Sequence, residues 1–262
     1  MALPRLTIVT PCLNGAATLP QALASVAAQN YPDLEHVVID GGSTDGTLEI
    51  LEAAGVRYIS EPDSGLSDAV NKGLRMATGE GIGWLNADDL YEPGALHRVG
   101  RAFAERTEAH WVTGRCRIID AHGRDIRRGV SAYKNALLAR YSYGLLVAQN
   151  FIACPATFVR RSAFDRVGLL DERFRYSMDY DLWLRVGRLG DPVVLGGAPL
   201  AAFRMAEGSL SMSGFEQQFA EHAQNAREHG QGHPLALAAN RVTSRAIVAI
   251  YRGMRELRAR RG

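Results

Sequence analysis

The sequence contains few cysteines, little net charge and no long apolar run, and each absence excludes a class of protein. Its three cysteines, Cys12, Cys116 and Cys154, are far apart and form no metal-spaced pair, which argues against a disulfide scaffold or a zinc module. We expect Cys12 and Cys154 to be small core residues. The formal net charge of +2 does not indicate a nucleic-acid partner.

Signals for secretion or membrane insertion are also missing. The N-terminal segment has no apolar h-region, and no stretch reaches the roughly 18 apolar residues that a membrane-spanning helix needs. Together with the odd number of cysteines, this predicts a protein of a reducing compartment. We therefore expect a cytoplasmic protein, or one attached peripherally to the inner face of the cell membrane.

Neither of the common phosphate-binding loops occurs. The chain has no G-x-x-x-x-G-K-[ST] motif, and no G-x-G-x-x-G follows its first predicted strand. The glycine-rich residues 79–83 enter a strand instead of leaving one, so we interpret them as a turn. These absences argue against a P-loop NTPase and against a dinucleotide-dependent oxidoreductase.

What the chain does contain is an alternation of strand and helix patterns. It has 262 residues, 47% of them hydrophobic, which is enough for one large core. Short β-branched runs alternate with amphipathic segments in the first half, and this predicts an α/β fold with a mainly parallel sheet. The predicted strands span residues 6–10, 36–40, 57–60 and 81–85, and the predicted helices follow Thr18 and span residues 47–54 and 66–77.

The second half is less regular. The pattern predicts strands over residues 110–120 and 193–195, and helices over residues 133–147, residues 182–189 and the stretch beyond Gly214.

The segment Asn86-Ala87-Asp88-Asp89 ends a buried strand with two adjacent carboxylates. Two such groups repel each other and are costly to desolvate, unless a cation shares their charge. Mg²⁺ and Mn²⁺ prefer oxygen ligands and are held by one or two carboxylates together with substrate phosphates, which fits Asp88. The alternative is that the two aspartates cap the helix that Pro93 helps to start, and the pattern alone leaves this open.

Polar residues follow all four predicted strands, at the edge where open α/β sheets bind ligands. They are Thr10, Pro11 and Asn14 after the first strand, Asp40, Ser43 and Asp45 after the second, Glu61, Asp63 and Ser64 after the third, and Asn86, Asp88 and Asp89 after the fourth.

Six short motifs occur along the chain in a fixed order. They are T-I-V-T-P-C-L-N at 7–14, D-G-G-S-T-D-G at 40–46, S-E-P-D-S-G at 60–65, N-K-G at 71–73, L-N-A-D-D at 85–89 and D-Y-D-L-W-L-R at 179–185. Together they resemble the family-two glycosyltransferases with the GT-A fold, over about residues 6–211. The resemblance implies transfer of a sugar from a nucleotide diphosphate to an acceptor, with inversion at the anomeric carbon. A further segment, Q-N-F-I-A-C-P-A-T-F at 149–158, resembles the acceptor-side wall of a subgroup that makes surface polysaccharides.

The resemblance also assigns a donor site to the strand ends. It places the nucleotide base beside Thr10, Pro11 and Asp40, and it makes Asp88, in the family's Asp-x-Asp position, the ligand of Mg²⁺ or Mn²⁺. The other residues of the implied donor site are Asn14, Ser43, Asp68, Lys72, Asn86 and Ala87. Asp40 can accept an N–H from uracil, guanine or thymine, so it does not decide among these bases. We expect a UDP-sugar first, with GDP- or dTDP-sugars as alternatives.

A second cluster is expected to supply the general base. Direct displacement at a sugar carbon needs a neutralised leaving diphosphate and an acceptor hydroxyl that loses its proton. Asp179 matches the family's catalytic base, whereas its neighbour Asp181 is expected to cap the following helix. Arg204 is expected to meet the diphosphate. Many relatives carry a histidine just after it, where this chain has Met205 and Ala206.

By this interpretation residues 1–212 form a GT-A catalytic domain, with a nucleotide-binding half at 1–105 and an acceptor-binding half at 106–212. Residues 213–262 form a C-terminal helical extension, and the acceptor is a saccharide or a lipid-linked saccharide. A nucleotidyltransferase is one alternative, although the loop at 14–17 lacks the basic residues that it should have. A catalytically inactive nucleotide-sugar-binding subunit is the other, and the presence of Asp88 and Asp179 gives it no support.

The C-terminal residues 241–262 are strongly basic, with seven arginines and one acid. Apolar residues recur there at spacings of three and four, which predicts one helical face. They are Ile247, Ile250, Tyr251, Met254 and Leu257. The helix either packs on the catalytic domain or lies on an anionic membrane surface, and the sequence leaves both possibilities open.

Overall fold

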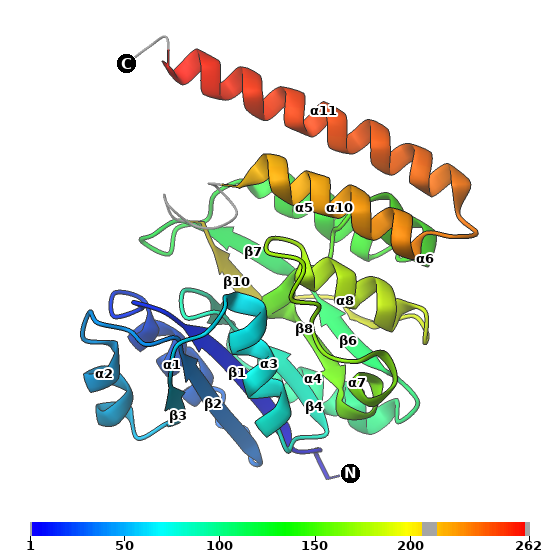
Figure 1. Ribbon diagram of the computed structural model, residues 1–262. Helices are drawn as coiled ribbons and strands as arrows, with labels where there is room; N and C mark the ends of the chain where they lie inside the picture. The colour runs from blue at the N-terminus through cyan, green and yellow to red at the C-terminus, as the bar shows by residue number, and fades with distance from the viewer. Residues whose placement is uncertain (1, 206–213, 260–262) are drawn as a thin grey trace.

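The computed structural model describes residues 2–205 and 214–259, with side chains described as far as Ala249. Two β-sheets form the frame of the molecule. The larger sheet has seven strands in the order β3-β2-β1-β4-β8-β6-β9, and the smaller has three in the order β5-β10-β7. The α/β fold with a mainly parallel sheet flanked by helices, expected from the sequence, is confirmed (Figure 1).

The first half of the chain forms four parallel strands of the larger sheet. The strands are β1 (Leu6–Cys12), β2 (Leu34–Asp40), β3 (Arg57–Ser60) and β4 (Gly81–Trp84), and the helices are α1 (Leu19–Ala27), α2 (Thr47–Ala54), α3 (Leu66–Met76) and α4 (Ala95–Glu105). β1 pairs in parallel with β2 and β4, and β2 with β3. The carboxyl ends of the four strands therefore share one edge, as predicted. Thr18 stands at the N-cap of α1, but its side chain makes no capping hydrogen bond.

Side chains of β1 alternate between two apolar cores, one on each face of the sheet. Val9 belongs to the core formed with α3 and α8, whereas Leu6 and Ile8 belong to the core formed with α4. A Cβ on Gly73 of α3 would lie 2.3 Å from a methyl carbon of Val9. Glycine at this position therefore lets α3 pack closely on β1. The first turn of α3 then borders the strand ends.

The segment predicted as a single strand over residues 110–120 is two strands in different sheets. β6 (Trp111–Gly114) pairs within the larger sheet, and β7 (Cys116–Ile119) pairs with β10 (Ala201–Arg204) in the smaller one. The prediction was wrong because both strands are apolar and only Arg115 separates them. The remaining strands are β5 (Leu90–Tyr91), β8 (Thr157–Arg160), which runs antiparallel to β4 and β6, and β9 (Val193–Leu195).

The helix predicted over residues 133–147 is also two elements, α5 (Arg128–Leu138) and α6 (Tyr143–Ala148). The hydroxyl of Ser142 accepts a hydrogen bond from the Leu145 backbone N–H and begins the second helix. Serine favours such caps over helix interiors, so the break has a local cause that the apolar periodicity hid.

Helix α8 (Met178–Gly187) begins four residues earlier than the sequence predicted. Its N-cap residue is Ser177, and both Asp179 and Asp181 lie in its first turn. The expectation that Asp181 caps the helix was therefore wrong. The short elements η1 (Cys154–Ala156) and α7 (Arg161–Val167) precede α8 along the chain.

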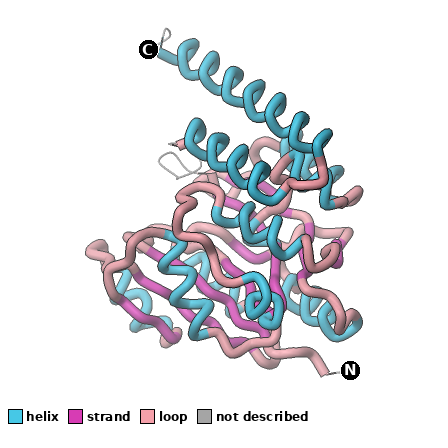
Figure 2. The backbone as a smooth tube through the Cα atoms, turned by 45° about the vertical axis from the view of Figure 1, so that its right-hand side comes forward, coloured by secondary structure: helices cyan, strands magenta, loops and turns pink. Residues whose placement is uncertain are grey.

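Two helices close the described chain, α10 (Phe215–His229) and α11 (Pro234–Ala259), as the pattern beyond Gly214 predicted. They lie one above the other, on the side of the sheets away from the N-terminus (Figures 1 and 2). α10 packs on α8, and α11 packs on α6 and α10. Asn240 is buried and donates hydrogen bonds to the carbonyl oxygens of Val147 and Ala148, at 3.2 and 3.3 Å, which ties α11 to the end of α6.

No helix within residues 2–205 or 214–259 combines the length and the apolar composition that crossing a membrane requires.

Candidate active site

Hydrogen bonds join the loops that follow β1 and β2 into one surface. The Asn14 backbone N–H donates to Ser43 Oγ at 2.7 Å, and the Asn14 side-chain oxygen accepts from the Thr44 backbone N–H at 2.9 Å. The Gly15 and Ala16 amides donate to the side chains of Thr47 and Asp45. Polar side chains of one loop thus satisfy the backbone of the other, so the two loops keep a fixed relative position.

Asp40 holds the second of these loops from inside. Its carboxylate is fully buried and accepts from the backbone amides of Gly42 and Ser43 and from the hydroxyls of Ser43 and Ser60. Burial acts to raise the pKa of Asp40, but these four hydrogen bonds outweigh it and lower the pKa. In this structure Asp40 is thus committed to the loop, and the predicted bond to a nucleotide base would need one of these donors to move.

Thr10 and Pro11 lie inside β1 and are buried. The Thr10 hydroxyl is 3.0 Å from Nε2 of His36 in the neighbouring strand. Burial lowers the pKa of His36 to about 4, so its ring is neutral near pH 7. These residues build the floor beneath the two loops.

Asp68 and Lys72 meet the loop after β3. Lys72 Nζ lies 3.0 Å from Glu61 Oε1 and 3.4 Å from Asp68 Oδ2, and it donates to the Pro62 carbonyl oxygen at 3.0 Å. The hydrogen bond from the Ser64 backbone N–H and the charge of Lys72 lower the pKa of Asp68. The predicted pair is therefore brought together at the strand edge, with Glu61 as a third member.

The two adjacent aspartates after β4 differ in environment. Asp88 is partly exposed, whereas Asp89 is completely buried. Asp89 accepts from the Arg204 backbone N–H at 2.8 Å and from the Asn86 side-chain amide at 3.2 Å. The N-cap of α4 is Gly94, so the alternative in which these aspartates cap that helix is excluded.

Burial raises the pKa of Asp88, and burial together with the neighbouring Asp88 charge raises the pKa of Asp89 well above its usual range. A nearby cation reverses such shifts. No group of three or more His, Cys, Asp or Glu side chains forms a ready metal site in the described residues. The donor set nevertheless fits Mg²⁺ or Mn²⁺, because such ions are usually held by one or two carboxylates plus substrate phosphates. Asp88 is the accessible carboxylate of this pair.

Arg204 lies beneath this turn and is 2% exposed. Its guanidinium donates to the carbonyl oxygens of Asp88, Asp120 and Ala121 and to Oε1 of Gln21, over 2.8 to 3.1 Å. Four acceptors, from the turn after β4, the loop after β7 and helix α1, occupy it in this structure. The predicted contact with a diphosphate would require Arg204 to exchange at least one of them, so the structure gives it a clamping role.

Asp179 lies in the first turn of α8 and is partly exposed. Burial raises its pKa to about 6, although the Tyr180 backbone amide, the charge of Lys134 and the Asn150 side chain act to lower it. Cys154 is partly buried, and its Sγ lies 3.9 Å from the Trp84 carbonyl oxygen at the end of β4. Burial raises the pKa of its thiol, and the charges of Asp179 and Asp89 add to this. The carboxylates of α8 and of the β4 end therefore converge on one region.

Asp181 points away from this region into a network with α10. Its carboxylate accepts from Arg185 Nη2 at 2.6 Å and lies 2.8 Å from His229 Nε2. Burial acts to raise the pKa of Asp181, but the His229 hydrogen bond and the Arg185 charge lower it overall. A carboxylate paired in this way is a poor general base, which leaves Asp179 as the better candidate.

Lys134 and Asn150 near Asp179 were not predicted as site residues. They come from α5 and from the segment after α6, and neither stands in a recognisable motif. Lys134 is partly buried, and burial lowers its pKa while the charge of Asp179 raises it. α5 packs on β7, and the folded chain brings its Lys134 within electrostatic reach of Asp179. The two residues are far apart in sequence, so no local sequence signal could have found the pair.

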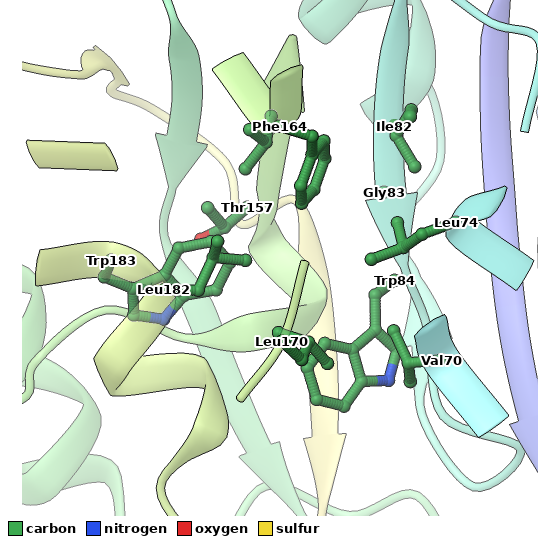
Figure 3. A pocket seen from close by; sticks show the side chains of 11 residues that line it. Val70, Leu74, Ile82, Gly83, Trp84, Thr157, Phe164, Leu170, Leu182 and Trp183 are labelled. Carbon is green, nitrogen blue, oxygen red and sulfur yellow. The ribbon is translucent and has the colours of Figure 1, made fainter. Parts of the chain in front are cut away.

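Neither of two hollows among the described residues is lined by the predicted donor-site residues. One of about 20 Å³ lies in the core between β4 and α8, lined by side chains such as Trp84, Leu170 and Trp183 (Figure 3). It holds at most a water molecule. A larger cavity of about 300 Å³ lies beside Asp181, Arg185 and His229, away from the strand ends. The candidate site is therefore the open strand edge.

The sequence match now decides the family. A model described as glycosyl transferase family 2 matches residues 7–168. The chain belongs to this family. A PGL/p-HBAD biosynthesis glycosyltransferase of Mycobacterium bovis is 35% identical over 192 residues, covering 71% of this chain and 70% of the relative. An uncharacterized glycosyltransferase of Rickettsia typhi is 29% identical over 193 residues, covering 71% and 59%. The expected glycosyltransferase class is thus confirmed.

Solved structures confirm the expected GT-A glycosyltransferase fold. The mannosyltransferase PcManGT from Pyrobaculum calidifontis, in complex with GDP-Man and Mn²⁺, superposes with a TM-score of 0.68 at 19% identity, over 97% of this chain and 81% of that one. S. aureus TarS 1-349, in complex with UDP-GlcNAc, gives 0.62 at 18% identity, over 84% and 66%. The chain spans 39% of a longer TarS structure. At these identities the likeness shows the fold.

Proposed function

We propose that this glycosyltransferase inverts the anomeric centre as it moves a sugar from a nucleotide-diphosphate sugar to a saccharide or lipid-linked saccharide, in the synthesis of a cell-surface glycan. The observation that carries the proposal is that Cys154, whose Sγ lies 3.9 Å from the Trp84 carbonyl oxygen at the end of β4, is within electrostatic reach of both Asp179 in α8 and Asp89, the neighbour of Asp88. The pKa values of Asp88 and Asp179 are both raised by burial. Asp88 suits the leaving-group side of a displacement, and Asp179 suits the acceptor side.

The donor lies along the loops after β1, β2 and β3 in this proposal. The joined loops at Asn14 and Ser43 border the nucleotide, and Lys72 supplies a positive charge beside it. The neighbouring structures contain UDP-GlcNAc, UDP and GDP-Man, which supports a nucleotide-sugar donor. UDP is the first nucleotide to test, followed by GDP and dTDP.

Asp88 would hold a divalent ion, Mg²⁺ or Mn²⁺, when the donor is bound. That ion would supply Lewis-acid neutralisation of the departing diphosphate. Asn86 positions the turn: its side-chain amide donates to Asp89 at 3.2 Å, and its oxygen accepts from the Trp84 indole at 2.7 Å. Ala87 is 9% exposed and packs beneath the turn.

Asp179 takes the proton of the acceptor hydroxyl. As the proton moves to this carboxylate, the hydroxyl oxygen forms a bond to the anomeric carbon, and the bond from that carbon to the diphosphate oxygen breaks with its electron pair leaving on the diphosphate. Attack from the face opposite the leaving group inverts the configuration. A carboxylate with a pKa of about 6 is ionised near pH 7 and is more basic than an ordinary aspartate, as a general base requires.

The domain division also belongs to this proposal. Residues 1–105 bind the nucleotide, residues 106–212 bind the acceptor, and residues 213–262 extend the catalytic domain. A lipid-linked acceptor on the cytoplasmic leaflet would bring the enzyme to a membrane surface, so such acceptors are among those to test.

Two experiments test the proposal. Thermal unfolding is measured with UDP, GDP and dTDP, each with and without Mn²⁺, because a ligand at 100 times its Kd stabilises by about 2.7 kcal/mol. Once a donor and acceptor are paired, NMR determines the anomeric configuration of the product. A product with the same configuration as the donor would reject direct displacement.

A further inference from the structure

Three side chains at four-residue intervals on α10 face the start of α8. They are Glu221, Asn225 and His229, and all three form hydrogen bonds to residues that flank or belong to the first turn of α8. A spacing of four places them on one side of a helix. This α10 polar face, as we call these three residues, thus contacts the turn that carries Asp179.

Glu221 makes the densest contact. It is 7% exposed, and its carboxylate accepts from the backbone amides of Arg175, Tyr176 and Ser177 at 3.3, 2.8 and 3.0 Å and from the Ser177 hydroxyl at 3.3 Å. Three consecutive backbone N–H groups therefore point at one buried carboxylate. This contact fixes the path of the chain two residues before Asp179.

Asn225 is fully buried and holds the same residue from its other side. Its side-chain amide donates to the Ser177 carbonyl oxygen at 3.1 Å and to Ser177 Oγ at 2.9 Å. Ser177 is the N-cap of α8, yet its side chain makes no capping bond within that helix. The hydroxyl that would usually cap the helix is bonded to α10 instead, so the orientation of the first turn depends on α10.

His229 completes the face one turn further along. Its Nε2 lies 2.8 Å from Asp181 Oδ1, while Arg185 binds the other carboxylate oxygen from within α8. The α10 polar face thus contacts the chain on both sides of Asp179, at Ser177 and at Asp181.

From this geometry we infer that Glu221 and Asn225 are positioning residues that set the place of the Asp179 carboxylate. The inference rests on the proposed function, since it assumes that Asp179 is the base. It makes α10, which lies beyond the residues matched by the family model, part of the catalytic unit. A base displaced by about 1 Å loses a large part of its effect.

The test compares Glu221→Gln with Glu228→Gln. Both glutamates lie on α10, but Glu228 pairs with Arg173 and Gln224 at the surface. Amide hydrogen exchange is measured for residues 175–181 in the full chain. Donor turnover is measured as UDP or GDP release from UDP-GlcNAc and GDP-Man with water as acceptor. Ser177→Ala, a milder change that keeps the backbone bonds to Glu221, serves as the second variant if Glu221→Gln unfolds.

Glu221→Gln should speed exchange at residues 175–177 by about tenfold or more, and Glu228→Gln should not. The kcat of Glu221→Gln should fall about tenfold with an unchanged donor KM. The same change in an Asp179→Asn background should cost no further turnover, because both act through one group. Ser177→Ala should show the same changes at about threefold.

Unchanged exchange in Glu221→Gln, or in Ser177→Ala where that variant replaces it, would overturn the positioning role. The positioning role would also be overturned if Glu221→Gln lowered turnover by the same factor in the wild-type chain and in the Asp179→Asn background. If Asp179→Asn itself keeps full turnover, the proposed function fails instead, and the exchange result still decides whether α10 orders this turn.

Discussion

The guanidinium Nε of Arg204 donates a 2.8 Å hydrogen bond to the backbone carbonyl oxygen of Asp88. The backbone N–H of the same arginine donates to the Asp89 carboxylate, also at 2.8 Å. Strand β10, far along the chain, therefore holds the turn after β4 from beneath. This contact orients Asp88 toward the strand edge through its main chain and leaves its carboxylate available.

Replacing Arg204 should cost stability. Arg204→Met removes the partner of three carbonyl oxygens and Gln21 inside the protein, and we expect a loss of about 3 kcal/mol because buried acceptors are left unpaired. Chemical denaturation provides the measurement. Arg124→Met is the control, since Arg124 is 74% exposed and should change stability by less than about 0.5 kcal/mol. Similar losses in both variants would contradict the clamping role.

Asp88→Asn should abolish the effect of Mn²⁺ on nucleotide binding. The fold should survive, because the change removes one of two desolvated neighbouring charges. Calorimetry with the nucleotide found by thermal unfolding, with and without Mn²⁺, measures the difference. Asp171→Asn, at a surface pair with Arg173, is the matched control. Metal-dependent tightening that persists in Asp88→Asn would remove Asp88 from the metal site.

Asp179→Asn should keep donor affinity and lose transfer by about 10²-fold or more, because the amide cannot accept the acceptor's proton. Asp181→Asn should lose less activity but more stability, since it breaks the buried pairing with Arg185 and His229. Steady-state kinetics and thermal unfolding of both variants give the comparison. The opposite ranking of the two activities would show that the base is misassigned.

The activity should fall as the pH drops below about 6. Asp179 acts in its ionised form, and its pKa is raised to about 6, so protonation removes the base over this range. Lys134 acts to lower that pKa through its charge, so Lys134→Met should move the acidic limb of the pH–rate profile to higher pH. Arg128→Met on the same helix, where the side chain is 83% exposed, should leave the profile in place. A limb that does not move with Lys134→Met would separate Lys134 from the base.

The C-terminal helix offers a further prediction. Arg241 and Arg245 are exposed, as is Val242, whereas Asn240 docks α11 on α6. Of the predicted apolar face, Ile247 is half-buried, and the residues from Ile250 onward lie beyond the described side chains. Truncation after Asn240 should abolish co-sedimentation with anionic liposomes and leave donor hydrolysis intact, because each basic residue at such a surface contributes about 1 kcal/mol. Neutral liposomes and high salt are the controls. If the full chain ignores anionic liposomes at low salt, α11 has a packing role only.

Much of the first half was decided by the sequence alone. The predicted bounds 47–54 and 57–60 coincide with α2 and β3, because apolar periodicity and turn residues act locally there. Parallel strands must end on one edge, so the polar residues after β1 to β4 could be placed together without coordinates. The Asp88 and Asp179 predictions rested on motif order and remain predictions.

The tertiary structure decided which partner each polar group takes. Asp40 and Arg204 were expected to face a ligand, but non-local hydrogen bonds to Ser60 and to Gln21 engage them inside the protein. The division of 110–120 between two sheets, and the approach of Lys134 and Glu221 to α8, depend on packing between segments distant in sequence. A pattern of local periodicity carries no information about such contacts, because burial and pairing are set only when the elements come together.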